Sequence, residues 1–171
     1  MENHGVLREK LDIKLLMLFI LRRLPGECRG ETLSELVLDN GGVGYFEYAE
    51  CLGELIDTEN VKHTPKGYAI TEKGDRNCEI VESSLPYTIR ARLAAQIAPM
   101  AERMRRDAMI TAAHSEEENG CRVELGLSDG LGSILELRLL CGSGEQAEKI
   151  EEHFRANAED YYNRIMELLL E

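Results

Sequence analysis

Residues 60–74 read NVKHTPKGYAITEKG, and this stretch predicts the architecture of the first half of the chain. Two short segments of strand-forming residues, 60–64 and 68–71, flank the sequence Pro65-Lys66-Gly67. Proline and glycine at these places are typical of a tight turn, so the two segments are predicted to form a hairpin. Thr71 follows, where its hydroxyl can cap the start of another helix.

Three helices are predicted upstream of this hairpin. The first, residues 8–24, is apolar on nearly all sides, which indicates that most of it is buried. The second, residues 32–38, begins with a capping box in which Thr32 and Glu35 satisfy early backbone N–H groups. The third starts near Gly44 after a glycine-rich turn.

The third helix separates its apolar and acidic residues onto two faces. The positions expected to face inward are Tyr45, Tyr48, Ala49, Leu52, Leu55 and Ile56. The outward face carries a carboxylate stripe of Glu47, Glu50, Glu54 and Asp57. Three helices followed by a small hairpin is the order of a winged helix-turn-helix domain, whose third helix normally enters the DNA major groove.

Several segments resemble a bacterial domain-of-unknown-function family, DUF4364, over nearly the whole chain. They are KLDIKLL at 10–16, YF at 45–46, LGEL at 52–55, YAITEKG at 68–74 and LP at 85–86. Members of that family resemble winged-helix transcriptional regulators. The resemblance implies DNA binding by analogy with those regulators and implies no catalytic residues.

The second half is predicted to be a small α+β domain. A helix over residues 87–106 precedes strands at 107–115, 121–128 and 134–141, and a long helix at 145–170 ends the chain. The second and third strands alternate cleanly, which indicates an antiparallel sheet with one buried face. The final helix is longer than the strands, so its far end is expected to pack on a second subunit.

The register of the last two strands follows from the alternation of residues between the two faces of a sheet, which the loop length must preserve. A five-residue loop, 129–133, keeps the apolar residues of both strands on one face and sets Glu124 opposite Arg138. The apolar pairs that it predicts are Leu127 with Leu135, Leu125 with Leu137 and Val123 with Leu139. A three-residue loop keeps the parity but opposes Glu124 to Glu136, an unfavourable pair of like charges.

The expected fold class is therefore α+β, with two domains. A winged helix-turn-helix domain takes residues 1–84, and residues 85–171 hold a linking helix, a three-stranded antiparallel sheet and a long C-terminal helix packed against it. The boundary is set at Leu85-Pro86.

The charge argues against strong binding of nucleic acid. The net charge is −12, and each half of the chain carries 10 basic and 16 acidic residues. A dedicated nucleic-acid binder usually has a basic domain or patch. The one basic concentration comprises Arg90, Arg92, Arg103, Arg105 and Arg106, which either pair with acidic residues of the protein or contact phosphates.

Other classes of function have little support in the sequence. The longest apolar run, residues 15–21, is too short for a membrane span, and we expect a cytoplasmic protein. The five cysteines are scattered and are expected to be reduced. No histidine or cysteine spacing fits a metal site, and no phosphate-binding loop is present, so we expect no metal, no cofactor and no enzyme activity.

These observations predict a transcriptional regulator that binds double-stranded DNA weakly and forms a homodimer, with a second half that dimerises or senses an effector. The expected DNA-binding residues are Tyr45, Tyr48, Lys62, His63, Lys66, Arg103 and Arg106. The alternative is a protein-interaction module that keeps the winged-helix core but has lost its affinity for DNA, which the carboxylate stripe favours.

Overall fold

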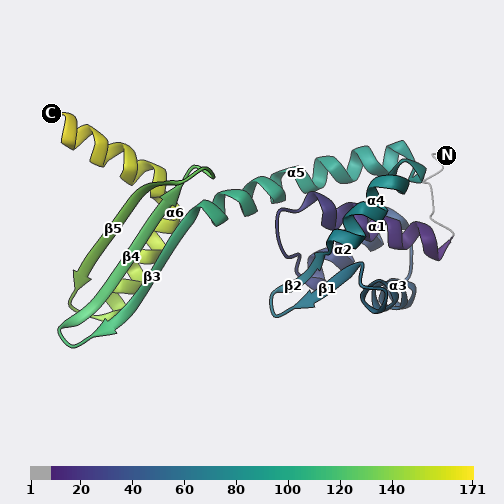
Figure 1. Ribbon diagram of the computed structural model, residues 1–171, viewed down its shortest axis with the longest axis horizontal. Helices are drawn as coiled ribbons and strands as arrows, with labels where there is room; N and C mark the ends of the chain where they lie inside the picture. Colours follow the sequence, from purple (N-terminus) through teal and green to yellow (C-terminus); the bar gives the residue numbers. More distant parts are fainter. Residues whose placement is uncertain (1–8) are drawn as a thin grey trace. The chain divides into compact units, whose positions relative to one another are not determined.

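The computed structural model describes residues 9–171 and divides the chain into two compact units (Figure 1). The first unit ends at Met104, and the second spans Arg105–Glu171. The division falls later than the expected boundary at residue 84. The reason is that helix α5, Tyr87–Met109, packs Ile89, Leu93 and Ile97 into the core of the first unit.

The first unit is built around a buried helix. Its elements are α1 (Lys10–Arg23), α2 (Gly30–Gly41), α3 (Tyr45–Asp57), β1 (Val61–Thr64), β2 (Gly67–Ile70), α4 (Glu72–Val81), a short 3-10 turn (Glu82–Ser84) and the first part of α5. Helix α1 buries every residue from Leu15 to Leu21, as its all-round apolar sequence predicts, whereas Leu11 is exposed. Arg8, the expected first residue of this helix, lies outside the described residues.

Helix α2 begins earlier than its sequence signal indicates. It starts at Gly30 with Arg29 as its N-cap, so Thr32 lies inside the helix and the predicted capping box is wrong. Packing explains the difference, because the burial of Leu33 and Val37 fixes the helix on the core. The helix ends at Gly41, and the following C-cap residue, Gly42, has a φ of 63°, the left-handed conformation that glycine adopts readily.

The predicted hairpin is confirmed, and a third segment joins it. Strands β1 and β2 pair in antiparallel fashion, with His63 opposite Tyr68. The Cys28 and Tyr68 backbones exchange two hydrogen bonds of 2.8 Å, so the chain before α2 extends the hairpin. A Cβ on Gly67 would lie only 2.1 Å from the Cys28 carbonyl oxygen, which explains the glycine at this close approach.

The second unit is a three-stranded antiparallel sheet with one long helix. Its strands β3 (Ile110–Glu117), β4 (Gly120–Ser128) and β5 (Ser133–Cys141) lie in the order β3-β4-β5. The predicted pairs are confirmed, with Leu125 opposite Leu137 and Glu124 opposite Arg138, but the predicted five-residue loop is wrong, because a register shift after Leu127 sets Ser133 opposite Ser128. The chain is thus an α+β protein in which helices precede a three-stranded sheet and a C-terminal helix.

Helix α6, Gly144–Leu170, covers part of the sheet and then leaves it (Figure 1). Ala147, Phe154 and Ala158 are buried against the apolar face of the sheet. The backbone departs from helical geometry at Asn157, where the Asn157 side chain donates to the His153 carbonyl oxygen. The predicted uninterrupted helix is therefore kinked. No helix in residues 9–171 is both long enough and apolar enough to cross a membrane.

Candidate nucleic-acid interface

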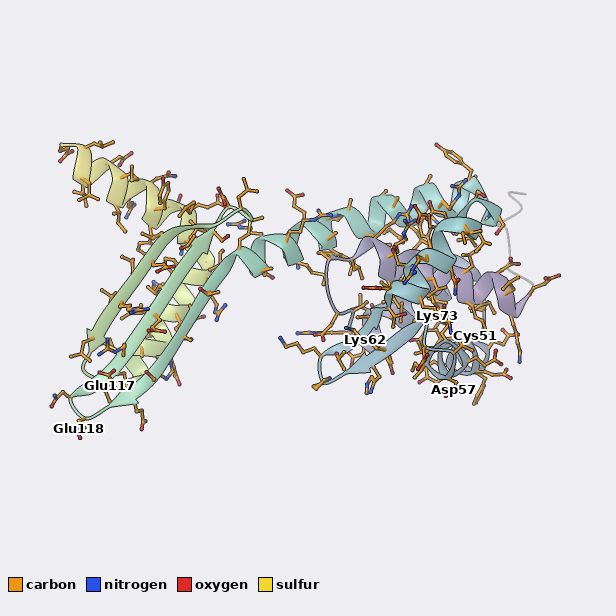
Figure 2. The ribbon with its side chains drawn as sticks, in the orientation of Figure 1. Cys51, Asp57, Lys62, Lys73, Glu117 and Glu118 are labelled. Atoms are coloured by element: carbon orange, nitrogen blue, oxygen red, sulfur yellow. The ribbon has the colours of Figure 1, made fainter. Side chains whose placement is uncertain are left out.

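Three of the expected DNA-binding residues lie on the β1–β2 hairpin. Lys62, His63 and Lys66 are all exposed, and Figure 2 shows the Lys62 side chain projecting from this hairpin. The turn is fixed locally, because the Lys66 backbone N–H donates to the Thr64 hydroxyl over 3.2 Å. The hairpin therefore presents two lysines from a defined backbone.

The hairpin also has a basic neighbour that sequence reasoning missed. Arg29 is exposed, and a Cβ on Gly67 would lie 3.1 Å from the Cα of Arg29. Arg29 therefore lies directly beside the hairpin turn. The pairing of Cys28 with Tyr68 puts it there, and no periodicity or motif in the sequence reveals that pairing.

The amino end of α3 presents aromatic side chains to solvent. Tyr45 is 63% exposed and Phe46 is 89% exposed. The inward orientation expected for Tyr45 is wrong, because its ring lies on the outside, 5.9 Å from the ring of Tyr48. Phe46 was not among the expected site residues, although its position off the apolar stripe of α3 was a usable signal.

Tyr48 belongs to the core and not to the surface. It is 4% exposed, and burial raises the pKa of its hydroxyl well above the ordinary value of 10.0. Its electrostatic neighbours include Tyr68 and Cys28, so Tyr48 connects the first turns of α3 to the base of the hairpin. Tyr48 is therefore not exposed enough to contact DNA directly.

The carboxylate stripe of α3 is largely engaged within the protein. Glu50 pairs with Lys10, and Glu54 pairs with Lys14, both lysines coming from α1. The hydrogen bond from Lys14 holds the pKa of the Glu54 carboxyl below its ordinary value. Glu47 accepts a hydrogen bond of 3.0 Å from the Gly44 backbone N–H and so caps its own helix. The negative charge that DNA would meet here is smaller than the sequence indicates.

The two arginines early in α5 have structural roles. Arg92 donates to the side-chain oxygen of Asn40 over 2.7 Å and to its backbone oxygen over 3.3 Å. Asn40 is buried at the end of α2. Arg90 donates to the Leu85 carbonyl oxygen. Both side chains therefore stabilise the first unit, although their partners are an asparagine and a backbone carbonyl and not the acidic residues that the first alternative expected.

The other two expected arginines fall in different units. Arg103 is exposed on the part of α5 that belongs to the first unit. Arg106 belongs to the second unit, where its guanidinium lies 3.9 Å from a Glu159 carboxylate oxygen.

The thiols are poorly suited to nucleophilic chemistry. All five cysteines are free and buried. Burial raises the pKa of Cys28 and of Cys78 to about 11, so both remain protonated at neutral pH. Within residues 9–171, no group of three or more His, Cys, Asp or Glu side chains is arranged to hold a metal ion.

Two hollows of the second unit lie on opposite faces of its sheet. The outer hollow, about 420 Å³, lies over polar residues that include the Arg138–Glu124 ion pair of 3.4 Å. The inner one is an apolar groove of about 330 Å³ between β5 and α6. Glu117 and Glu118 lie away from both, at the β3–β4 turn (Figure 2).

Comparison with known proteins identifies one family. The model of the family described as Domain of unknown function (DUF4364) matches residues 13–169, which is most of the chain. No curated protein and no solved structure matches.

Proposed function

The chain belongs to the DUF4364 family, and we propose that it is a DNA-binding transcriptional regulator whose first unit is a winged helix-turn-helix domain. The order of α1, α2, α3 and the β1–β2 hairpin supports this proposal, as does the segment at Cys28 that pairs with β2. Helices α2 and α3 are separated by only three residues, 42–44, as in a helix-turn-helix.

The observation that carries the proposal is the basic hairpin beside an α3 in which Glu50 and Glu54 pair with lysines of α1. Lys62, Lys66 and Arg29 contact phosphates, while the amino end of α3, residues 43–49, approaches the base edges. The positive end of the α3 dipole and its first backbone N–H groups also favour an anion there. The lysines of α1 reduce the repulsion that the stripe would otherwise cause.

The affinity of a single copy is weak. The net charge of −12 repels a polyanion at long range, and only a few basic side chains oppose it. Binding that depends on a few phosphate contacts also falls steeply as salt rises. A homodimer binds DNA more tightly than one copy, because two copies double the number of phosphate contacts.

We further propose that the second unit holds the two copies together. Helix α6 has 27 residues and spans about 40 Å, whereas the nine residues of β4 span about 30 Å. Part of α6 therefore extends past its own sheet. The outer hollow over Glu124 and Arg138 is the place for an effector. The protein acts in the cytoplasm, where its five buried thiols remain reduced.

The test compares two variants of equal net charge. Lys62→Gln/Lys66→Gln removes two charges from the hairpin, and Arg122→Gln/Arg138→Gln removes two from the sheet of the second unit. Fluorescence anisotropy with random duplex DNA measures affinity over a range of low salt concentrations. Each lost phosphate contact lowers the slope of log affinity against log salt by about 1, so the hairpin variant should lose about 2.

The control variant should keep the native slope. Equal losses in the two variants would mean that only the net charge matters and would remove the hairpin from the site. Absence of binding by the native protein even at the lowest salt would overturn the proposed function.

A second candidate function is a protein-interaction module on the same scaffold. The exposed pair of Tyr45 and Phe46 favours it, because aromatic side chains are enriched among the anchor residues of protein interfaces. This candidate predicts no binding of duplex DNA at any salt concentration, so the same titration separates the two functions.

A further inference from the structure

The apolar groove of the second unit exists because α6 covers only part of the sheet. The helix lies over β3 and β4, and the inward-facing row of β5 is left partly open. Leu137 and Leu139 from β5 form one wall, and Ile150, Phe154 and Tyr161 from α6 form the other. Leu139 is 43% exposed although it faces the same side as the core.

The last part of α6 is an apolar segment without a place in its own unit. We call residues 163–170 the tail, because Tyr162 before them still packs against the core of the second unit. In the tail, Leu168, Leu169 and Leu170 are 71%, 76% and 80% exposed. Three consecutive exposed leucines at a helix end are unfavourable in water, since each leaves most of its apolar surface unburied.

The tail cannot fill the groove of its own chain. Tyr161 lines the groove and stacks on Phe154, with the ring centroids 6.0 Å apart. The helix continues without a break from Tyr161 to Leu170, about 14 Å further along its axis. A helix that leaves one end of a groove cannot turn back into it, so the tail can reach only the groove of another molecule.

The groove carries basic side chains, and the last turn of α6 carries an acidic one. The groove is lined by Lys149 and His153 and by no acidic residue. In the tail, Arg164 lies one turn before Glu167, and Glu171 follows the last leucine. The side chain of Lys149 is exposed at the rim, where it pairs with Glu145 over 2.8 Å and leaves N–H groups for a carboxylate of an incoming tail.

We propose that two copies of this chain dimerise by exchanging tails, each tail lying in the apolar groove between β5 and α6 of the other copy. Because each copy has one groove and one tail, a twofold axis satisfies both at once and leaves no open end. This inference rests on the homodimer proposed above and names its interface.

Sedimentation equilibrium without DNA tests the exchange, so its result is independent of the proposed DNA binding. The groove variants are Leu139→Asp and, at an exposed position that leaves the fold intact, Lys149→Glu. The tail variant is Leu168→Ser/Leu169→Ser/Leu170→Ser. The matched control is Leu140→Asp, which alters the next residue of β5 on the opposite face of the sheet.

We expect the native protein and the Leu140 control to be dimers at tens of micromolar. Loss of the three leucines should raise the dimer dissociation constant on the order of a hundredfold or more. Lys149→Glu should raise it less. A native protein that is monomeric, or a tail variant that dimerises as well as the native protein, would overturn the proposal.

Mixing the variants separates exchange from any other dimer. A groove variant keeps an intact tail and a tail variant keeps an intact groove, so one productive contact forms only between the two. We expect Leu139→Asp mixed with the tail variant to form more dimer than either alone. A mixture with no more dimer than its components would contradict reciprocal exchange.

Discussion

Lys10 and Lys14 set the charge of the α3 surface, although neither lies on α3. Lys14 pairs with Glu54 and Lys10 with Glu50. The sequence predicted the carboxylate stripe correctly as an outward face, but it gave no sign of this neutralisation. The lysines lie about 40 residues away in the chain, and only the packing of α1 against α3 brings them together.

Removing these lysines should weaken DNA binding through the carboxylates that they leave behind. We expect Lys10→Met/Lys14→Met to lower affinity for duplex DNA at low salt by about tenfold, because two unpaired carboxylates then repel phosphate. Adding Glu50→Gln/Glu54→Gln should restore most of the affinity. Anisotropy titration of the three proteins measures this, and a failure of the glutamines to restore binding would mean that the lysines contact DNA themselves.

The two tyrosines of α3 show where periodicity stops being informative. The 3.6-residue period placed Tyr45 and Tyr48 on one face, and Tyr48 is indeed buried. Tyr45 is exposed because its turn of helix extends past the core, which no pattern within the helix can indicate. The expected site consequently included one buried residue, Tyr48, and did not include the exposed Phe46 and Arg29.

At the scale of elements, packing explains why the segment YAITEKG, residues 68–74, ends in a glycine. Thr71 caps α4 as predicted, by accepting a hydrogen bond from the Gly74 backbone N–H over 3.1 Å. A Cβ on Gly74 would lie 2.1 Å from the Asn60 carbonyl oxygen. This close approach joins α4 to the base of the hairpin, so the glycine fixes the hairpin that carries Lys62 and Lys66.

Two glycine substitutions should therefore have opposite effects on stability. Gly74→Ala meets backbone and should destabilise the protein by about 1–3 kcal/mol. Gly53→Ala, in α3 with open space around the new methyl group, should stabilise it by about 0.5–1 kcal/mol. Urea unfolding followed by circular dichroism measures both, and a neutral Gly74→Ala would show that α4 can move away from Asn60 at no cost.

The pairing of the strands, whose residue pattern repeats every two positions, was predicted more accurately than the places where helices begin or bend. The register of β4 and β5 followed from parity, because a shift by one residue would have moved every leucine to the wrong face. The start of α2 and the kink at Asn157 were missed. Burial of Leu33 overrode a local capping signal, and the kink depends on an asparagine that bonds to its own helix.

At the scale of the whole molecule, the protein has two small cores, and its net charge of −12 limits its affinity for DNA. The α+β class and both sets of elements were predictable, because each core has a clear apolar pattern. The division after Met104 was not, since the core side of α5 is set by contacts with α1 and α2. The expected DNA-binding residues consequently divide between two units.

The central claim is that the hairpin and the amino end of α3 contact DNA. Amide chemical-shift mapping of the isotope-labelled protein with random duplex DNA, at a salt concentration of about 50 mM where electrostatic binding is strong, tests it most directly. We predict that the largest shifts fall at residues 43–49 and 62–67 and at Arg29, while β3, β4 and β5 change little. Largest shifts on the sheet of the second unit, or none at any residue, would contradict the account.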